Sequence, residues 1–353
     1  MDILVYGAGA IGGYLGSRLL QDGHHVVMLE RQEIADAINA DGFVLKEGGQ
    51  TDQVNPTAVS SIEQALANNG NIDLIILGLK SFDLQLALEQ LSTTCPDSAS
   101  ILTVQNGIGV EQPFIDQFGA ERIIAASLTT PVSKEKQNVL VIERSDRGLG
   151  LAPTLAGQDI GRWTSLFQEA GITTTGLEDY ESMKWSKALL NMVSNATSAI
   201  LDMTPGEVYR NGESYNLEIR MLKEMLAVMA KKQLEVVDLP GPSARNLTTG
   251  LQWAPRLLLK PVLTKIVSKG RGDKMPSFYI DLTSGRGKSE VIYHNGAVAE
   301  AGTAVGVATP VNQVLNDVLL QLTRNEIARQ IYEKNPERLA AEIDRISRRE
   351  TGI

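Results

Sequence analysis

The sequence has almost none of the residues from which disulfide bonds and metal clusters are built. Cys95 is its single cysteine, and its three histidines show no metal-ligand spacing. One cysteine excludes a disulfide within the chain and any cysteine-based metal cluster, and it is typical of a protein from a reducing compartment. We therefore expect no bound metal.

Long apolar runs and an excess of positive charge are also missing. No stretch reaches the roughly 18 apolar residues of a membrane-spanning helix, and no signal peptide precedes the first predicted strand. The formal net charge of −9 argues against a nucleic-acid or anionic-membrane partner. We expect a cytoplasmic protein whose anionic ligands are held by local cations and by helix termini.

The amino-terminal stretch combines a strand, a glycine turn and a helix. Residues 3–6 form a short apolar run typical of a buried parallel strand, and Gly7, Gly9 and Gly12 follow it as G-x-G-x-x-G. Residues 14–20 then have helical spacing. This is the dinucleotide-binding fingerprint in the context that it requires: the glycines permit a tight turn, the approach of a pyrophosphate and close helix packing. The alternative is a turn that only packs the strand and helix layers.

The second predicted strand, residues 25–29, ends where such folds contact the adenosine ribose. Glu30 and Arg31 stand there side by side. An acidic residue at this position favours the free 2′-hydroxyl of NAD, and an arginine favours the 2′-phosphate of NADP. The residues alone do not decide between NAD and NADP. Arg31 is also interpretable as a solvated surface charge that binds no cofactor.

Two more predicted buried strands, residues 72–79 and 100–104, are followed by Lys80 and by Asn106. Ligands of an open parallel sheet bind beyond the carboxyl ends of its strands, so we expect both side chains at the crevice of the glycine turn. A lysine there can bind a phosphate or carboxylate, and an asparagine can hydrogen-bond an amide, hydroxyl or carboxylate. The alternative for each is a turn residue.

The pattern changes near residue 178. Up to that point strands alternate with helices, whereas from Asp179 onward the chain is almost entirely helical in pattern. We predict an α/β domain of the Rossmann type over residues 1–178, which binds the dinucleotide. An all-α domain over residues 179–353 is expected to bind the substrate and to carry the catalytic groups.

The helical half opens with Lys187, Asn191 and Asn195, which are spaced by four and are expected along one helix face. Apolar neighbours predict that this helix is largely buried. A buried lysine in line with two asparagines is costly for a purely structural helix. Burial also makes an ammonium easier to deprotonate, which suits a proton donor. A solvated polar stripe is the alternative.

Later positions have structural interpretations from the residues alone. Ser277 is a candidate N-cap, and Glu290 is a candidate first-turn acid. Residues 251–275 are amphipathic and rich in lysine and arginine. We interpret them as an insert of the helical domain or as a subunit contact in a homodimer. A membrane-surface helix is disfavoured because the chain is acidic overall.

Taken together and in this order, these segments resemble the ketopantoate reductase family over the whole chain. The matching pieces are the sequence G-A-G-A-I-G, Leu79-Lys80, Asn106-Gly107, Trp185-x-Lys187 with Asn191 and Asn195, and the segment from Ser277 through Glu290 to Asn295-Gly296. The resemblance implies a Rossmann-type dinucleotide-binding domain followed by an all-α domain like the C-terminal domain of 6-phosphogluconate dehydrogenase.

The resemblance also implies an activity, the NADPH-dependent reduction of 2-dehydropantoate to (R)-pantoate on the route to pantothenate and coenzyme A. It implies that Lys187 is the general acid and that Glu290 orients this lysine and contacts the nicotinamide ribose and the substrate hydroxyl. The implied cofactor contacts are Gly7, Ala8, Gly9, Ala10, Ile11, Gly12, Arg31, Lys80, Asn106 and Glu290. The implied substrate contacts are Asn106, Lys187, Asn191, Asn195 and Ser277.

Two other functions stay open at this point. A related enzyme would reduce another 2-oxo acid or an imine with the same hydride chemistry. A redox sensor would bind NADP(H) and regulate a partner without turnover. The presence of Lys187 together with Glu290 favours catalysis, because a sensor needs no proton donor.

Overall fold

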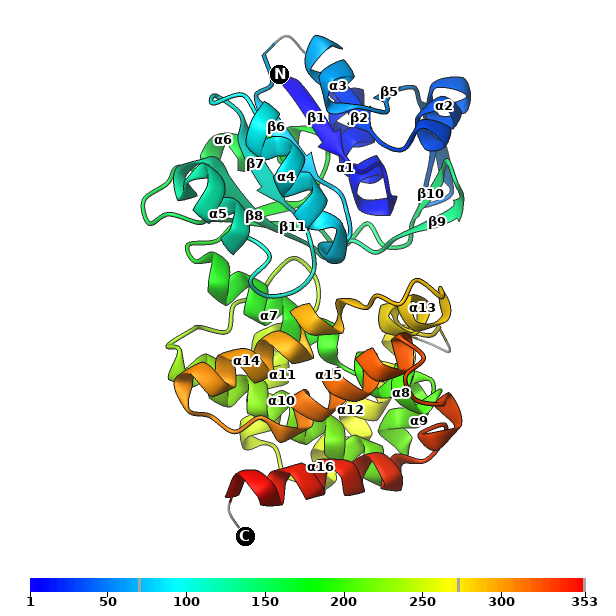
Figure 1. Cartoon of the computed structure of the whole chain (residues 1–353), viewed down its shortest axis with the longest axis vertical. Coiled ribbons are helices and arrows are strands. Elements are labelled where there is room, and N and C mark those ends of the chain that lie inside the picture. Colours follow the sequence, from blue (N-terminus) through cyan, green and yellow to red (C-terminus); the bar gives the residue numbers. More distant parts are fainter. Residues whose placement is uncertain (69–70, 272–273, 352–353) are drawn as a thin grey trace. The chain divides into compact units, whose positions relative to one another are not determined.

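A computed structural model of the chain describes residues 1–68, 71–271 and 274–351, and its contacts divide it into two units (Figure 1). The first unit comprises Met1–Lys184 with Asp238–Pro242, and the second comprises Trp185–Val237 with Ser243–Ile353. The division falls within one helix, after Lys184, whereas the sequence predicts a boundary near residue 178.

The first unit contains an eight-stranded sheet in the order β12-β11-β8-β7-β6-β1-β2-β5. Neighbouring strands are parallel except for the antiparallel pair β8 and β11. The interior strands are runs of Ile, Leu and Val that are buried on both faces, as a helix-covered parallel sheet requires. The strand bounds are β1 Asp2–Tyr6, β2 His25–Leu29, β5 Thr57–Val59, β6 Leu74–Leu77, β7 Ser100–Thr103, β8 Ile123–Leu128, β11 Leu149–Pro153 and β12 Thr174–Gly176.

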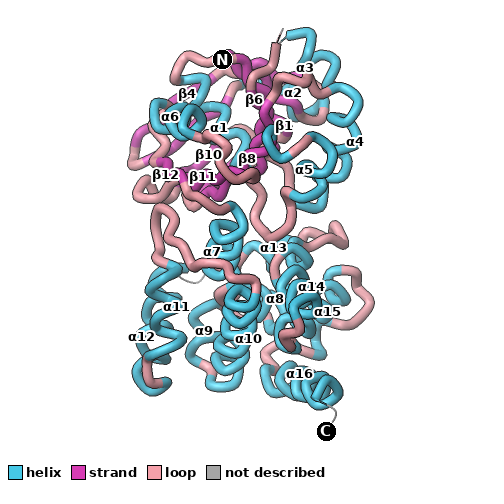
Figure 2. Tube along the Cα trace, turned by 90° about the vertical axis from the view of Figure 1, so that its left-hand side faces the viewer, coloured by secondary structure: helices cyan, strands magenta, loops and turns pink. Residues whose placement is uncertain are grey.

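Helices cover both faces of this sheet, as predicted for a Rossmann-type domain (Figure 2). On one face lie α3 (Ile62–Asn68), α4 (Leu84–Thr94) and α5 (Gln112–Phe118); on the other lie α1 (Ala10–Gln21) and α6 (Gly161–Glu169). Leu15 and Leu19 of α1 and Phe167 of α6 are fully buried in one shared core. The remaining helices of this unit are α2 (Gln32–Asp41), which packs beside β5, and the short η1 (Ser81–Asp83) and η2 (Ala120–Arg122).

A second sheet, in the order β4-β3-β10-β9, packs against α1. Its strands are β3 Phe43–Glu47, β4 Gln50–Val54, β9 Val132–Lys136 and β10 Val139–Ile142. A Cβ on Gly13 of α1 would lie 3.1 Å from Leu140 and 3.2 Å from Phe43, so the helix and the sheet are in close contact. Strand β9 is not predicted from the sequence because its residues V-S-K-E-K lack apolar alternation, and pairing with β10 holds it at the edge of the sheet.

The second unit is helical in every element that the structure describes, as predicted. The 20-residue helix α10 packs against α9, α14, α15 and α16, and its buried residues Leu217, Met221 and Met225 lie in that core. The elements from α7 to the C-terminal helix are α7 Tyr180–Met192, α8 Asn195–Leu201, α9 Pro205–Arg210, α10 Gly212–Lys231, α11 Ala244–Trp253, α12 Arg256–Arg271, α13 Ser277–Thr283, η3 Glu290–Tyr293, α14 Asn295–Val305, α15 Pro310–Thr323, η4 Arg329–Ile331 and α16 Pro336–Thr351.

Helix α12 has two apolar faces. One is buried and packs against neighbours that include α9; it contains Leu259, Leu263 and Val267. The other is exposed and contains Leu257, Leu258, Val262 and Ile266. This exposed face lies within the segment 251–275, for which a subunit contact stays a prediction.

Across the described ranges, we find no helix with both the length and the apolar character needed to cross a membrane.

Candidate active site

The register of the parallel strands aligns their carboxyl ends. Tyr6, the last residue of β1, pairs with Leu29 at the end of β2 and with Leu77 at the end of β6. Leu77 in turn pairs with Thr103 at the end of β7. The segments that follow these strands therefore begin side by side at one edge of the sheet, and they carry the glycine turn, Glu30, Arg31, Lys80 and Asn106, as predicted.

The glycine turn that joins β1 to α1 leaves open backbone for a ligand. Gly7 has a φ of 97°, and a Cβ on Gly12 would lie 2.0 Å from the carbonyl oxygen of Gly7, so the fold itself requires both glycines. A Cβ on Gly9 would lie 3.8 Å from the carbonyl oxygen of Gly78, and no other atom from elsewhere in the described part of the chain would come closer. Packing therefore does not explain Gly9, and the bare backbone at the N-terminus of α1 fits the pyrophosphate of a dinucleotide.

Glu30 and Arg31, which follow β2, differ strongly in how far their side chains are exposed to solvent. The Glu30 side chain is 15% exposed, and its Oε2 accepts a 2.9 Å hydrogen bond from the backbone N–H of Arg31. The Arg31 side chain is 82% exposed, with its Nε 3.9 Å from Glu30 Oε2. The guanidinium is thus accessible to an anionic ligand, and an acceptor for a ribose hydroxyl stands beside it.

Hydrogen bonds join the two segments that carry Lys80 and Asn106. Ser81 Oγ donates a 3.0 Å hydrogen bond to the carbonyl oxygen of Asn106. Gln105 Nε2 donates to the carbonyl oxygens of Leu77 and Leu79. These bonds cross-link the segments that follow β6 and β7. Lys80 is exposed and Asn106 is half-buried, so both side chains are accessible to a ligand at this edge.

A buried ion pair that the sequence does not predict lies next to this edge. Lys184 Nζ lies 2.7 Å from Glu111 Oε1 and donates a 3.0 Å hydrogen bond to the carbonyl oxygen of Gln105. The two side chains are only 3% and 1% exposed. The pair ties the beginning of α7 to the loop that carries Asn106. Local sequence gives no signal for it, since only the tertiary fold shows which lysine of α7 is buried.

In the second unit, Lys187, Asn191 and Asn195 do not share one continuous helix, and that prediction was wrong for Asn195. Helix α7 ends at Met192 and α8 begins at Asn195. Between them Ser194 adopts the left-handed conformation with a φ of 57°. Lys187 and Asn191, both on α7, are half-buried, so Lys187 is also less buried than expected.

A buried carboxylate accounts for the break between α7 and α8. Glu218 of α10 is fully buried and accepts hydrogen bonds from the Ser194 N–H at 2.7 Å and from the Thr197 hydroxyl at 2.6 Å. The Tyr209 hydroxyl donates a third bond at 3.3 Å. These bonds compensate the cost of burying the charge and stabilise Ser194 in a conformation that non-glycine residues rarely adopt.

The structure brings Asn195 and Ser277 together. Asn195 Nδ2 donates to Ser277 Oγ at 3.2 Å, and Asn195 Oδ1 accepts from the Phe278 N–H at 3.1 Å. Ser277 is the first residue of α13 and Pro276 occupies the N-cap position, without a side-chain cap of its own. The interpretation of Ser277 as an N-cap was therefore wrong, because Asn195 binds the free N–H of the first turn from another helix.

Glu290 opens η3 and is 4% exposed. It does not begin an α-helix, because α14 starts only at Asn295. The Glu290 N–H lies 3.4 Å from Oδ2 of Asp281, a residue of α13. Helix α13 thus connects Glu290 to Ser277. The roles of these side chains in binding or catalysis stay predictions.

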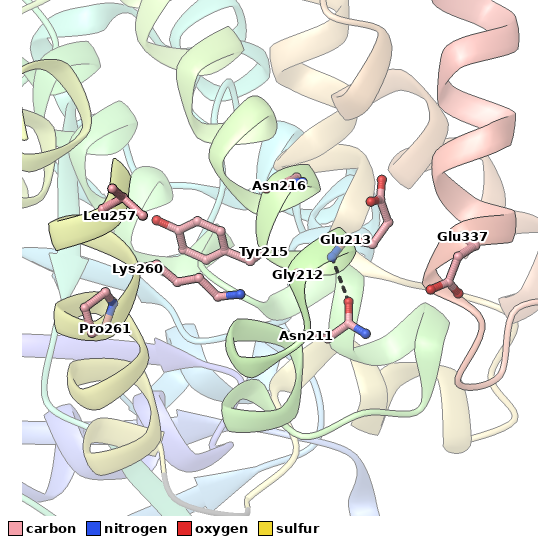
Figure 3. A pocket seen from close by; sticks show the side chains of 9 residues that line it. All are labelled: Asn211, Gly212, Glu213, Tyr215, Asn216, Leu257, Lys260, Pro261 and Glu337. Carbon is pink, nitrogen blue, oxygen red and sulfur yellow. Dashed lines mark hydrogen bonds between the residues drawn. The ribbon is translucent and has the colours of Figure 1, made fainter. Parts of the chain in front are cut away.

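A hollow of about 620 Å³ lies elsewhere in the second unit, between the start of α10 and α12 (Figure 3). Asn211 caps α10 there, with its Oδ1 accepting from the Glu213 N–H at 2.9 Å. No residue of the candidate site is among those that line the hollow, which are Asn211, Gly212, Glu213, Tyr215, Asn216, Leu257, Lys260, Pro261 and Glu337. We therefore do not assign the active site to it.

Sequence similarity to other proteins covers nearly the whole chain. It is similar to the 2-dehydropantoate 2-reductase of Pyrococcus horikoshii, with 27% identity over 320 residues that cover 89% of this chain and 95% of that protein. The protein of the same name from Pyrococcus abyssi is 28% identical over 319 residues, with the same coverage.

Two solved structures share the fold. One is D-mandelate dehydrogenase in a ternary structure with NADH and anilino(oxo)acetate, with a TM-score of 0.77, 21% identity, and coverage of 92% of this chain and 99% of that one. The other is a PanE/ApbA family ketopantoate reductase from Ralstonia eutropha JMP134, with a TM-score of 0.76, 24% identity, and coverage of 94% and 100%.

Two family models match consecutive parts of the sequence. The model of ketopantoate reductase PanE/ApbA matches residues 3–148, and the model of its C-terminal part matches residues 179–323. Together they account for most of the chain and for both of its units. The chain therefore belongs to the ketopantoate reductase family.

Proposed function

We propose that the chain catalyses the NADPH-dependent reduction of 2-dehydropantoate to (R)-pantoate. The observation that carries this proposal is the open backbone at Gly9, at a sheet edge that also presents Arg31, Lys80 and Asn106, in a member of this family. The glycine turn would bind the pyrophosphate, and Lys80 and Asn106 would contact the cofactor, with Asn106 also contacting the substrate.

The reaction adds a hydride to the ketone carbon and a proton to its oxygen. A bound reduced nicotinamide would supply the hydride. Lys187 would hydrogen-bond the ketone oxygen, stabilise the negative charge that develops there and protonate the forming alkoxide. Glu290 would orient the Lys187 amine and contact the nicotinamide ribose and the substrate hydroxyl.

Polar side chains of the helical unit would hold the substrate. Asn191, Asn195 and Ser277 would bind its carboxylate and hydroxyl groups. The contact between Asn195 and Ser277 supports this assignment, because it fixes two of the three groups relative to each other before a substrate arrives. Such preorganisation reduces the entropic cost of binding the substrate.

A second candidate is the NADH-dependent reduction of another 2-oxo acid. Two observations favour it. Glu30 presents an acceptor where a ribose 2′-hydroxyl would bind. The fold is also similar to that of D-mandelate dehydrogenase, whose ternary structure contains NADH and anilino(oxo)acetate.

Both candidates are tested by following the oxidation of NADPH and of NADH by absorbance, with 2-dehydropantoate and a panel of small 2-oxo acids. We expect the highest kcat/KM with NADPH and 2-dehydropantoate. A higher value with another acid would support the second candidate. Tight NADPH binding with no turnover of any acid would contradict both and indicate a redox sensor.

A further inference from the structure

Lys134 is a cation at the glycine turn that the proposed function leaves without a role. It lies on β9, the edge strand of the four-stranded sheet, and its Nζ is 3.4 Å from the carbonyl oxygen of Ala8. Ala8 stands between Gly7 and Gly9 in the turn. Lys134 is an exposed residue whose ammonium is partly desolvated beside the turn, so a ligand seated on the turn can reach it.

The ammonium of Lys134 has unused hydrogen-bonding capacity. A lysine ammonium has three donors. Among the residues that the structure describes, Ala8 provides the one acceptor for Lys134, and no carboxylate lies within ion-pair distance. Lys46 of β3, in the same sheet, differs, since its Nζ is paired with Glu135 at 2.7 Å. Lys134 therefore keeps donors available for an anion.

Glu30 stands beside the turn that Lys134 contacts, because the Gly7 N–H donates a 2.9 Å hydrogen bond to the carbonyl oxygen of Leu29, the residue before Glu30. Partial desolvation lowers the pKa of Lys134, and the negative charge of Glu30 opposes that shift. Glu30 also occupies the position from which an acid binds a ribose 2′-hydroxyl. A 2′-phosphate placed there would be repelled by Glu30 unless cations compensate the charge. Arg31 is one such cation, 3.9 Å from Glu30.

We propose that Lys134 binds the 2′-phosphate of NADPH and, together with Arg31, makes NADPH the preferred cofactor in spite of Glu30. Its ammonium would exchange the long contact to Ala8 for a charge-assisted hydrogen bond to a phosphate oxygen. This inference rests on the proposed binding of a nicotinamide dinucleotide and names a residue that determines which one is bound.

The test is the dissociation constant of NADPH and of NADH, measured by titration calorimetry on the full chain without substrate. We expect Lys134→Met to weaken NADPH binding by roughly ten-fold or more, the value of one charge-assisted hydrogen bond, and to leave NADH binding unchanged. Lys136→Met is the matched control, because Lys136 is exposed on the same strand and the substitution removes the same charge. It should leave both constants unchanged.

A second variant tests the role of Glu30. Glu30→Gln removes the repulsion, so NADPH should bind more tightly and NADH no more tightly than before. An equal loss for NADPH and NADH in Lys134→Met would place this lysine at the pyrophosphate and overturn the inference. Unchanged NADPH binding would also overturn it.

These outcomes are distinguishable from failure of the proposed function. The proposed reductase activity is judged by turnover of 2-dehydropantoate in the wild type, which none of the binding measurements uses. If the wild type bound neither dinucleotide, the proposed function would fail and the inference would fail with it.

Discussion

The ammonium of Lys184 lies 2.7 Å from the carboxylate of Glu111, and both groups are almost fully buried. Glu111 Oε1 also accepts a hydrogen bond from the Thr103 hydroxyl, whereas the buried Oε2 has no hydrogen-bond partner among the described residues. The carboxylate therefore depends on Lys184 to compensate its charge. The ion pair fixes the start of α7, the helix that contains Lys184. Lys187, the proposed acid, lies one turn further along the same helix.

Removing one member of this pair should strongly destabilise the protein. Lys184→Met leaves the Glu111 carboxylate buried and unpaired, which should reduce the free energy of unfolding by about 3–5 kcal/mol. The measurement is urea-induced unfolding followed by circular dichroism. Lys136→Met, an exposed lysine, is the control and should change stability by less than about 0.5 kcal/mol.

The double variant Lys184→Met with Glu111→Gln tests whether the two side chains stabilise the protein as a coupled pair or independently of each other. A neutral amide no longer needs the ammonium, so the double variant should be more stable than the sum of the two single losses predicts. Strict additivity of the two losses would show that the ion pair has no energetic role.

Asn195 should act as the cap of α13, because its Oδ1 accepts from the Phe278 N–H. Asn195→Ala should lower the free energy of unfolding by about 1 kcal/mol, the usual cost of losing a helix N-cap. Ser277→Ala keeps the contact to Phe278 and should cost less. Thermal unfolding of the two variants tests the order; a larger loss for Ser277→Ala would contradict the capping role.

The single cysteine should react slowly with alkylating reagents. Burial raises the pKa of the Cys95 thiol, and the nearby Arg122 guanidinium, 3.1 Å from the sulfur, opposes the shift. A raised pKa means less thiolate at a given pH, so the alkylation rate should rise at a higher pH than it does for the urea-unfolded chain.

The pH dependence of the rate distinguishes this effect from simple steric protection. Protection alone would slow the reaction without moving the midpoint of the rate against pH. Arg122→Ala should move the midpoint further upward, since it removes the cation that favours the thiolate. A midpoint at or below that of the unfolded chain would show that the thiol pKa is not raised.

The N-terminal sheet edge could be predicted from the sequence because its signals are local. The apolar run before Gly7, the glycine spacing and the strand at residues 25–29 each depend on neighbours within a few residues. The position of Lys80 and Asn106 could be predicted for a similar reason, since parallel strands align their carboxyl ends and each residue comes shortly after a strand. The change to an all-helical pattern was likewise readable from periodicity.

The features that were missed depend on contacts between distant residues. Ser194 adopts a left-handed conformation because of the buried carboxylate of Glu218, and no glycine marks the break. Lys184 and Lys187 have similar local surroundings, and only Glu111 shows which of them is the buried one. The polar strand that carries Lys134 is ordered by pairing with β10 and has no apolar pattern of its own.

The central claim is that Lys187 donates the proton in the reduction of a ketone. The variant Lys187→Ala removes the amine but none of the groups at the glycine turn, so it should still bind NADPH as the wild type does. A general acid contributes roughly 10²-fold or more to the rate.

The most direct test is kcat of Lys187→Ala against that of the wild type, with saturating NADPH and 2-dehydropantoate and with NADPH affinity measured in parallel. We predict a fall in kcat of roughly 10²-fold or more with the NADPH dissociation constant unchanged. A kcat close to that of the wild type would contradict the account and remove Lys187 from the mechanism.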